Sequence, residues 1–152
     1  MKAKAYYIAP FRGRDGDNAA PADIAHNIEI AIERAAMIQQ TFAGTLDLWV
    51  PHKQIMINMA WERGWIDTQR VLWICTDLIR KWEPICIVDE WLDYTSKGMQ
   101  LEIDTALEIK APVEIIKPWD DEDKSNVASA IGEWMVRHGT LPQERDATGP
   151  LA

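Results

Sequence analysis

Residues 84–89 read PICIVD, and this short stretch decides the fold class. Four consecutive apolar side chains follow Pro84, so a strand here is apolar on both of its faces. Such strands are typical of a parallel sheet that helices cover on both sides. Three further apolar segments, each ending at a Pro, are expected to be its neighbours: residues 4–10 (KAYYIAP), 45–51 (TLDLWVP) and 111–118 (APVEIIKP).

Segments with helical periodicity and helix-ending residues lie between these strands. The expected helices are residues 22–42, 67–82, 97–109 and 121–139, with a short helix within 52–65. Because strands alternate with helices, the sequence predicts an α/β fold, a Rossmann- or flavodoxin-like three-layer sandwich with a parallel sheet of four to five strands. This domain is expected to span residues 1–138, and the Pro-, Gly- and polar-rich residues 139–152 to form a loose C-terminal tail.

Composition excludes several classes of partner. The net charge of −8 argues against a nucleic-acid partner, because neutralising phosphates requires clustered Lys and Arg. The chain lacks an apolar run of about 18 residues, so no membrane partner is expected. Two Cys residues, Cys75 and Cys86, are too few for a disulfide framework, which favours a cytoplasmic location. The three His residues are far apart in the sequence, so no metal site is expected.

The loops that follow the strands carry the first candidate residues, since ligands of open parallel sheets bind beyond the carboxyl ends of the strands. After the first strand, Gly13 lets backbone approach a ligand, and the neighbouring Arg12 suits a phosphate or carboxylate. His52 follows the second strand and is expected at the pocket as a base or a phosphate contact. Asp89 ends the third strand, and Trp91 near it could stack on a nucleobase.

The stretch TSKGMQLEIDTA, residues 95–106, places further candidates at the start of a helix. Ser96 is a good N-cap, and the positive end of this helix, with Gly98 in its first turn, is a ready anion site. The packing stripe of the helix is Met99, Ile103 and Ala106. Glu102 lies beside that stripe, on the side toward the carboxyl end of the strand.

Each candidate also has an ordinary structural interpretation. Arg12 can be a solvated loop charge, His52 a hydrogen-bonded structural His, and Asp89 simply the end of a strand. Ser96 is a good N-cap whatever else it does, and Glu102 gains modestly from the helix dipole. Periodicity alone leaves both interpretations open.

The order of five short motifs resembles one enzyme superfamily. The motifs are YYIAPFRG (6–13), NIEIAIERAAMI (27–38), VPH (50–52), CTDLIRKWEPICIV (75–88) and SKGMQLEIDTA (96–106). Over roughly residues 4–135 the chain resembles the nucleoside 2-deoxyribosyltransferase-like superfamily, and most of all its short branch with PH after the second strand. That superfamily also contains deoxynucleoside 5′-phosphate N-hydrolases and CMP hydrolases.

The resemblance implies a catalytic set. Glu102 would be a nucleophile that attacks the anomeric carbon of a nucleoside or nucleotide, as the carboxylate of a retaining glycosidase does. Asp77 matches the second carboxylate of the family, which protonates or orients the base, and Asp89 is the runner-up for that role. Tyr6 matches a Tyr that orients the Glu.

The resemblance also implies a phosphate site. Arg12 and Gly13 match the segment that binds a 5′-phosphate in the nucleotide hydrolases. Ser96, six residues before Glu102, matches a phosphate-binding Ser; the nucleoside transferases have an Asp there, which would repel phosphate. Ser129 resembles a further phosphate-contacting Ser that a neighbouring subunit delivers, which implies a homodimer or a higher homo-oligomer.

Together these implications predict a hydrolase that cleaves the N-glycosidic bond of a nucleoside 5′-monophosphate without a metal or cofactor. The expected partner is therefore a small-molecule nucleotide or nucleoside. Two alternatives stay open: a nucleoside 2-deoxyribosyltransferase that exchanges bases, and a non-catalytic nucleotide-binding module on the same fold.

Overall fold

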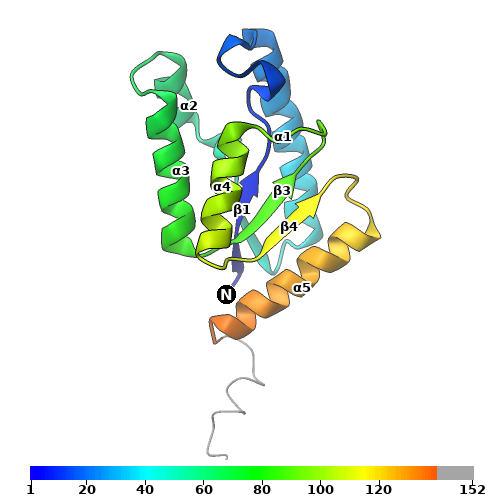
Figure 1. The fold of residues 1–152 in the computed structure, drawn as a ribbon. Coiled ribbons are helices and arrows are strands. Elements are labelled where there is room, and N and C mark those ends of the chain that lie inside the picture. The colour runs from blue at the N-terminus through cyan, green and yellow to red at the C-terminus, as the bar shows by residue number, and fades with distance from the viewer. Residues whose placement is uncertain (140–152) are drawn as a thin grey trace, which may run out of the picture.

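A computed structural model describes residues 1–139 of the chain. Its sheet has four strands: β1 (Ala3–Ile8), β2 (Leu46–Trp49), β3 (Ile85–Asp89) and β4 (Val113–Ile116). They lie in the order β2-β1-β3-β4, and all of the pairings are parallel. The arrowheads of β1, β3 and β4 in Figure 1 point the same way. The predicted fold class, an α/β sandwich with a parallel sheet, is confirmed.

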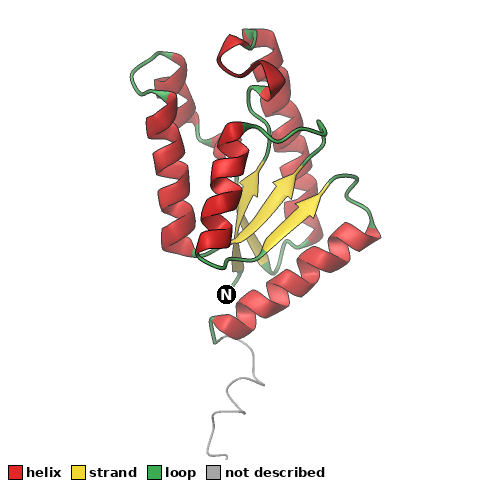
Figure 2. Ribbon diagram, in the orientation of Figure 1, coloured by secondary structure: helices red, strands yellow, loops and turns green. Residues whose placement is uncertain are grey.

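The helices alternate with these strands (Figure 2). They are α1 (Pro21–Thr41), α2 (Ile55–Glu62), α3 (Thr68–Trp82), α4 (Lys97–Glu108) and α5 (Asp121–Arg137), with short 3₁₀ segments η1 (Gly13–Asn18) and η2 (Pro51–Lys53). Each helix expected from periodicity is present, although residues 13–18, expected as a loop, form η1. The expected tail, residues 139–152, lies outside the described residues except for Gly139.

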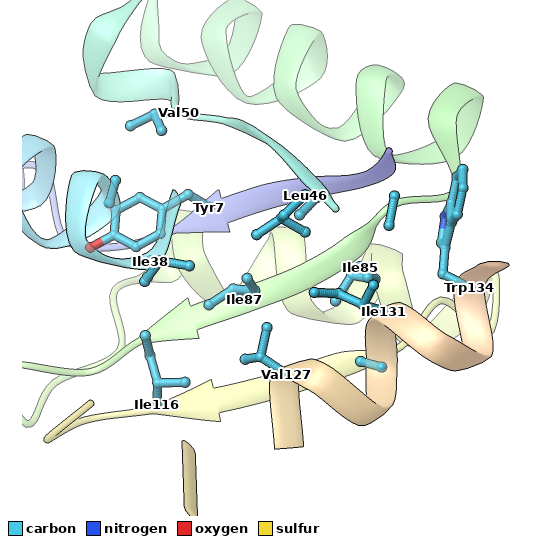
Figure 3. Packing of buried hydrophobic residues seen from close by; sticks show 14 of the residues in the cluster. Tyr7, Ile38, Leu46, Val50, Ile85, Ile87, Ile116, Val127, Ile131 and Trp134 are labelled. Atoms are coloured by element: carbon cyan, nitrogen blue, oxygen red, sulfur yellow. The ribbon is translucent and has the colours of Figure 1, made fainter. Parts of the chain in front are cut away.

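The alternation of β3 divides the core into two layers, because successive strand residues point to opposite faces. Ile85 and Ile87 belong to the cluster that α1 and α5 cover, and Figure 3 shows them packed beside Val127 of α5. Cys86 and Val88 belong to the other cluster, which α3 and α4 cover. Residues 85–88 are fully buried on both faces of the sheet, which explains why these four side chains of PICIVD are all apolar. Across residues 1–139, no helix combines the length and apolar character that crossing a bilayer requires.

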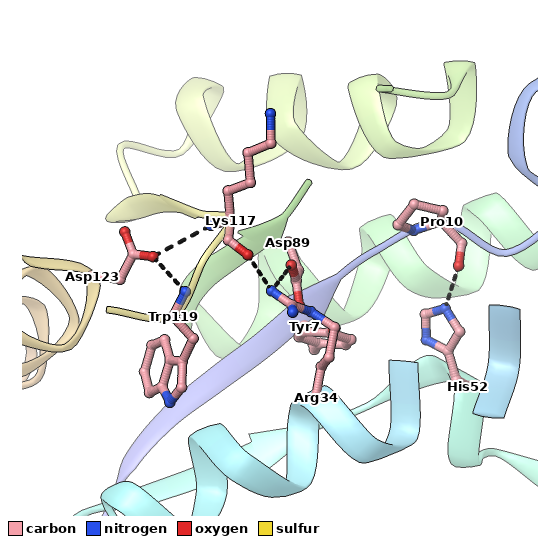
Figure 4. Close-up of polar contacts among 8 residues, drawn as sticks. All are labelled: Tyr7, Pro10, Arg34, His52, Asp89, Lys117, Trp119 and Asp123. Carbon is pink, nitrogen blue, oxygen red and sulfur yellow. Dashed lines mark hydrogen bonds and ion pairs between the residues drawn. The ribbon is translucent and has the colours of Figure 1, made fainter. Parts of the chain in front are cut away.

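A polar cluster fastens the carboxyl end of β3 on the α1 side of the sheet (Figure 4). Asp89 is fully buried and accepts hydrogen bonds from Arg34 Nε at 2.7 Å, Arg34 Nη2 at 2.8 Å and the Tyr7 hydroxyl at 2.6 Å. Arg34 Nη2 also donates to the Lys117 carbonyl after β4. The two-pronged ion pair thus joins α1, β1, β3 and the β4–α5 loop at one point.

We predict that Asp89→Asn destabilises the fold strongly, because it leaves the Arg34 guanidinium beside the core without its counter-charge. The expected loss is about 3 kcal/mol in the free energy of unfolding, measured by urea denaturation. Asp77→Asn is the matched control, since Asp77 pairs with Lys81 at 2.9 Å on the partly exposed side of α3. Such a pair contributes about 0.3–0.5 kcal/mol. Equal losses in the two variants would contradict the structural role of the Asp89 cluster.

Candidate functional site

A pocket of about 580 Å³ opens at the carboxyl ends of the strands, where parallel-sheet folds bind their ligands. Its walls come from the segment after β1, from η2 and α2, from the first turns of α3, and from the beginning of α4. The predicted site residues that line it are Arg12, Gly13, His52, Ser96, Gly98 and Glu102. Three separate segments of the chain, the one after β1, η2 and the start of α4, therefore bring together residues that the sequence analysis selected.

Glu102 is a buried carboxyl group in this pocket. It lies one turn from Met99 and Ala106, both in the core, and this helical spacing leaves Glu102 only 8% exposed. Its Oε2 accepts a hydrogen bond from the hydroxyl of Tyr6, which itself is fully buried in β1. Burial raises the pKa of Glu102 to about 8, against the opposing effect of the Tyr6 hydrogen bond. The structure thus brings together the Glu and Tyr that were predicted to act as a pair.

The N-terminus of α4 forms the neighbouring wall. Ser96 Oγ accepts a hydrogen bond from the Met99 amide at 3.1 Å, so Ser96 is the helix cap. The amides of Lys97 and Gly98 belong to the first turn, where a helix supplies no internal acceptor. A Cβ at Gly98 would lie 3.1 Å from Leu72 Cδ2, so a larger residue there would require the end of the Leu72 side chain to move. This end of the helix suits an anion, although the cap itself explains Ser96 without one.

Arg12 lies against an aromatic surface that the sequence analysis did not identify. Its guanidinium carbon is 4.1 Å from the centre of the Trp61 ring. The Trp61 ring is fixed in turn by a 3.1 Å hydrogen bond from its Nε1 to Thr68 Oγ1, which joins α2 to α3. Gly13 follows with a φ of +72°, a backbone conformation that Gly adopts without strain. The predicted phosphate residues therefore stand beside a flat aromatic wall.

His52 is buried, with an exposed fraction of 3%. Its Nε2 lies 3.0 Å from the Pro10 carbonyl, which requires a donor and so places the ring proton on Nε2 (Figure 4). Phe11 stacks on the ring at 4.1 Å, and burial lowers the pKa of His52 to about 4. The ring gives its one N–H to Pro10 and is neutral, which does not favour the predicted phosphate contact. Its Nδ1 is buried and has no hydrogen-bond partner among residues 1–139, so the predicted role as a base stays a prediction. The ring also holds the segment after β1 in place.

Four predicted site residues lie away from the pocket. Asp77 faces Lys81 on α3, and Asp89 is held by Arg34 and Tyr7, so neither lines the pocket as a second carboxylate. Trp91 packs against the core cluster on the α1 side, which does not favour its predicted role in stacking on a base. Ser129 is exposed on α5, and its predicted contact with the pocket of a neighbouring subunit stays a prediction.

Several pocket residues escaped the sequence analysis. They include Phe11, Gln54, Asn58, Trp61, Tyr94 and Lys97. The available signal was the i, i+4 spacing of Ile57 and Trp61 directly after the second strand, which marks one face of a helix near the strand ends. Trp49, the last residue of β2, lines the pocket and also stacks on Tyr6, with 5.2 Å between the ring centres.

Comparison of the chain with models of protein families, with curated proteins and with solved structures found no match. Within residues 1–139, no three His, Cys, Asp or Glu side chains are grouped so that they could hold a metal ion.

We predict that Glu102→Gln stabilises the protein increasingly as pH rises. Between about pH 4.5 and 8 the unfolded chain releases the Glu102 proton while the folded chain keeps it, so the stability of the wild type falls over this range. Gln carries no such penalty, and each unit of pKa shift is worth about 1.4 kcal/mol. The gain should therefore be near zero at pH 4.5 and reach a few kcal/mol at pH 8.

The measurement is the free energy of unfolding of both proteins across that pH range. Glu108→Gln, at the exposed end of the same helix, is the control for loss of a carboxylate and should show no comparable gain. A Glu102→Gln gain that does not change with pH would refute the burial effect.

Proposed function

We propose that this protein hydrolyses the N-glycosidic bond of a nucleoside 5′-monophosphate, with Glu102 as the nucleophile. The observation that carries the proposal is the buried carboxyl group of Glu102, which accepts a hydrogen bond from Tyr6. Glu102 lines a pocket that has an aromatic wall and, at the start of α4, an end that suits an anion. The resemblance in motif order supports the same assignment, because it pairs the same Tyr and Glu. A pocket of about 580 Å³ is of the size that small-molecule ligands occupy.

The reaction proceeds in two displacements. The Glu102 carboxylate attacks C1′ of the sugar, the C1′–N bond breaks, and the base leaves with the bonding electrons. Since neither Asp77 nor Asp89 lines the pocket, the departing base takes its proton from water. A second water then attacks C1′ while its proton goes to the hydroxide that the first water left. The bond between C1′ and Glu102 breaks, and the sugar 5-phosphate and the Glu102 carboxylate are released with the configuration at C1′ retained.

Tyr6 positions the nucleophile in this scheme. Its hydroxyl donates to one carboxylate oxygen and leaves the other to face C1′. Burial and the neighbouring Glu102 charge raise the pKa of the Tyr6 hydroxyl well above its ordinary value, so it remains a donor at every physiological pH. Burial and the same charge raise the pKa of Cys75 to about 12, so its thiol stays protonated and does not compete as a nucleophile.

The phosphate binds at the cationic end of the pocket. Arg12 and Lys97 line the pocket from different segments, and the first amides of α4 point out of the helix end between Ser96 and Gly98. Cationic side chains and free helix amides both favour an anion with several acceptor oxygens. The aromatic wall that includes Trp61 and Phe11 then takes the base.

We predict that the wild-type protein releases free base from at least one nucleoside 5′-monophosphate or deoxynucleoside 5′-monophosphate, and that Glu102→Gln lowers the rate at least a hundredfold. The assay is chromatographic detection of base. Asp77→Asn is the matched control and should keep wild-type activity, because Asp77 does not line the pocket. Only the ionised carboxylate attacks, so kcat/KM should rise with pH toward about 8.

Other outcomes of this assay point to the other functions. A rate that falls as pH rises would mean that Glu102 acts as an acid on the leaving base. A new nucleoside formed on addition of an acceptor base would indicate a transferase. Tight binding of nucleotides with no release of base would indicate a non-catalytic binding module.

We predict that Ser96→Asp weakens binding of a nucleoside monophosphate at least tenfold and binding of the matching nucleoside by less than twofold. Asp caps a helix as well as Ser does, so the contact with the Met99 amide is preserved while a negative charge enters the anion end. Calorimetry with Glu102→Gln as background measures binding without turnover. Equal losses for the two ligands would count against a phosphate at this end, and a thermal melt checks that the cap survives.

A further inference from the structure

Two amide side chains, those of Gln54 and Asn58, line the pocket at the start of α2. In each of them the amide nitrogen donates to the backbone. Asn58 Nδ2 donates to the carbonyl oxygens of Pro51 and His52, each at 3.2 Å. Gln54 Nε2 donates to the Val50 carbonyl at 3.2 Å. Both N–H groups of Asn58 are therefore used on the backbone of the segment after β2, whereas Gln54 uses one of its two.

Chemistry fixes these orientations. Each amide nitrogen faces carbonyl oxygens, which accept and cannot donate. Exchanging the nitrogen and oxygen of Asn58 would bring its own oxygen against two carbonyl oxygens and lose both hydrogen bonds. Among residues 1–139, no hydrogen bond reaches Asn58 Oδ1 or Gln54 Oε1. These two oxygens are left as acceptors for a ligand.

The acceptors belong to the base end of the pocket. Asn58 is one turn from Trp61 on α2, and Ile57 beside it also lines the pocket, so the amide stands next to the aromatic wall. The anion end is built by other segments, namely the start of α4 and Arg12, whose guanidinium contacts the aromatic wall at Trp61. The oxygens of a phosphate group accept hydrogen bonds, so Asn58 Oδ1 and Gln54 Oε1 would repel a phosphate placed beside them. A group that donates hydrogen bonds fits there.

We infer that Asn58 and Gln54 select adenine and cytosine, which carry an amino group where hypoxanthine and uracil carry a carbonyl, over those two oxo bases. This inference rests on the proposed function, because it places the base against α2. Adenine carries an amino donor where hypoxanthine has a carbonyl, and cytosine carries one where uracil has a carbonyl. An oxo group would face two acceptor oxygens and leave them without partners.

The test compares matched substrates, AMP with IMP and CMP with UMP, in two measurements. One is kcat/KM for base release by the wild type, and the other is the Kd of the same nucleotides for the Glu102→Gln protein. At least one pair should show a tenfold to hundredfold preference for the amino-bearing member. Gln54→Met, which keeps the side-chain length, should reduce that ratio several-fold, as should Asn58→Leu if it folds. Lys97→Met is the control: it should weaken both members of a pair equally and leave the ratio unchanged.

Each outcome separates this inference from the function on which it rests. Base release with no preference, or with a preference for IMP and UMP, overturns the selectivity and leaves the hydrolase. A binding preference for AMP or CMP with no base release supports the selectivity and overturns the hydrolase. Neither release nor binding of any of the four nucleotides overturns both. If Gln54→Met and a folded Asn58→Leu both keep the wild-type preference for the amino-bearing nucleotide, the selectivity comes from other residues and the inference is wrong.

Discussion

The hydrogen bond from Tyr6 to Glu102 joins β1, one of the two inner strands of the sheet, to α4, the helix that follows β3. It holds a carboxyl group where burial raises its pKa to about 8, far from the range of an exposed Glu. The Tyr6 ring is held in turn by stacking on Trp49 at 5.2 Å, in the neighbouring strand. The position of the reactive group thus depends on packing within the sheet, and the pocket chemistry follows from that position. Carboxyl groups kept in such surroundings are frequent at catalytic sites.

Successive side chains of β1 point to opposite faces of the sheet, so the consecutive residues Tyr6 and Tyr7 have different roles. Tyr6 points to the α3–α4 side and holds Glu102 at the pocket, whereas Tyr7 points to the α1–α5 side and holds Asp89 in the structural cluster with Arg34. Both carboxyl groups lie near the carboxyl ends of the strands, and both are buried, but they differ in charge balance. Asp89 has a guanidinium partner and serves the fold. Glu102 is paired with a neutral hydroxyl, which leaves its charge free to stabilise a developing cation at C1′.

The fold could be predicted from the sequence because PICIVD and its neighbouring apolar strands admit few arrangements other than a covered parallel sheet. The orientation of Glu102 could also be predicted, since its helical spacing from Met99 and Ala106 places it on the buried side of α4. Asp89 was selected as a site residue because the sequence does not show which way a carboxylate at a strand end points. It can face the pocket or, as here, an Arg that is 55 residues away in the chain. Trp61 and Asn58 were missed because α2 (IMINMAWE) is apolar on nearly all sides and has no buried face, so periodicity does not show which side covers the pocket. Its place over the pocket is set by tertiary contacts with α3.

The most direct test of the nucleophile is to trap the covalent intermediate. The protein is mixed with a nucleotide that it cleaves, quenched in acid within the first turnover, digested, and analysed by mass spectrometry. This account predicts a sugar phosphate adduct on the peptide that contains Glu102, absent from the Glu102→Gln protein. Base release without any adduct, at a rate that Glu102→Gln leaves unchanged, would contradict it.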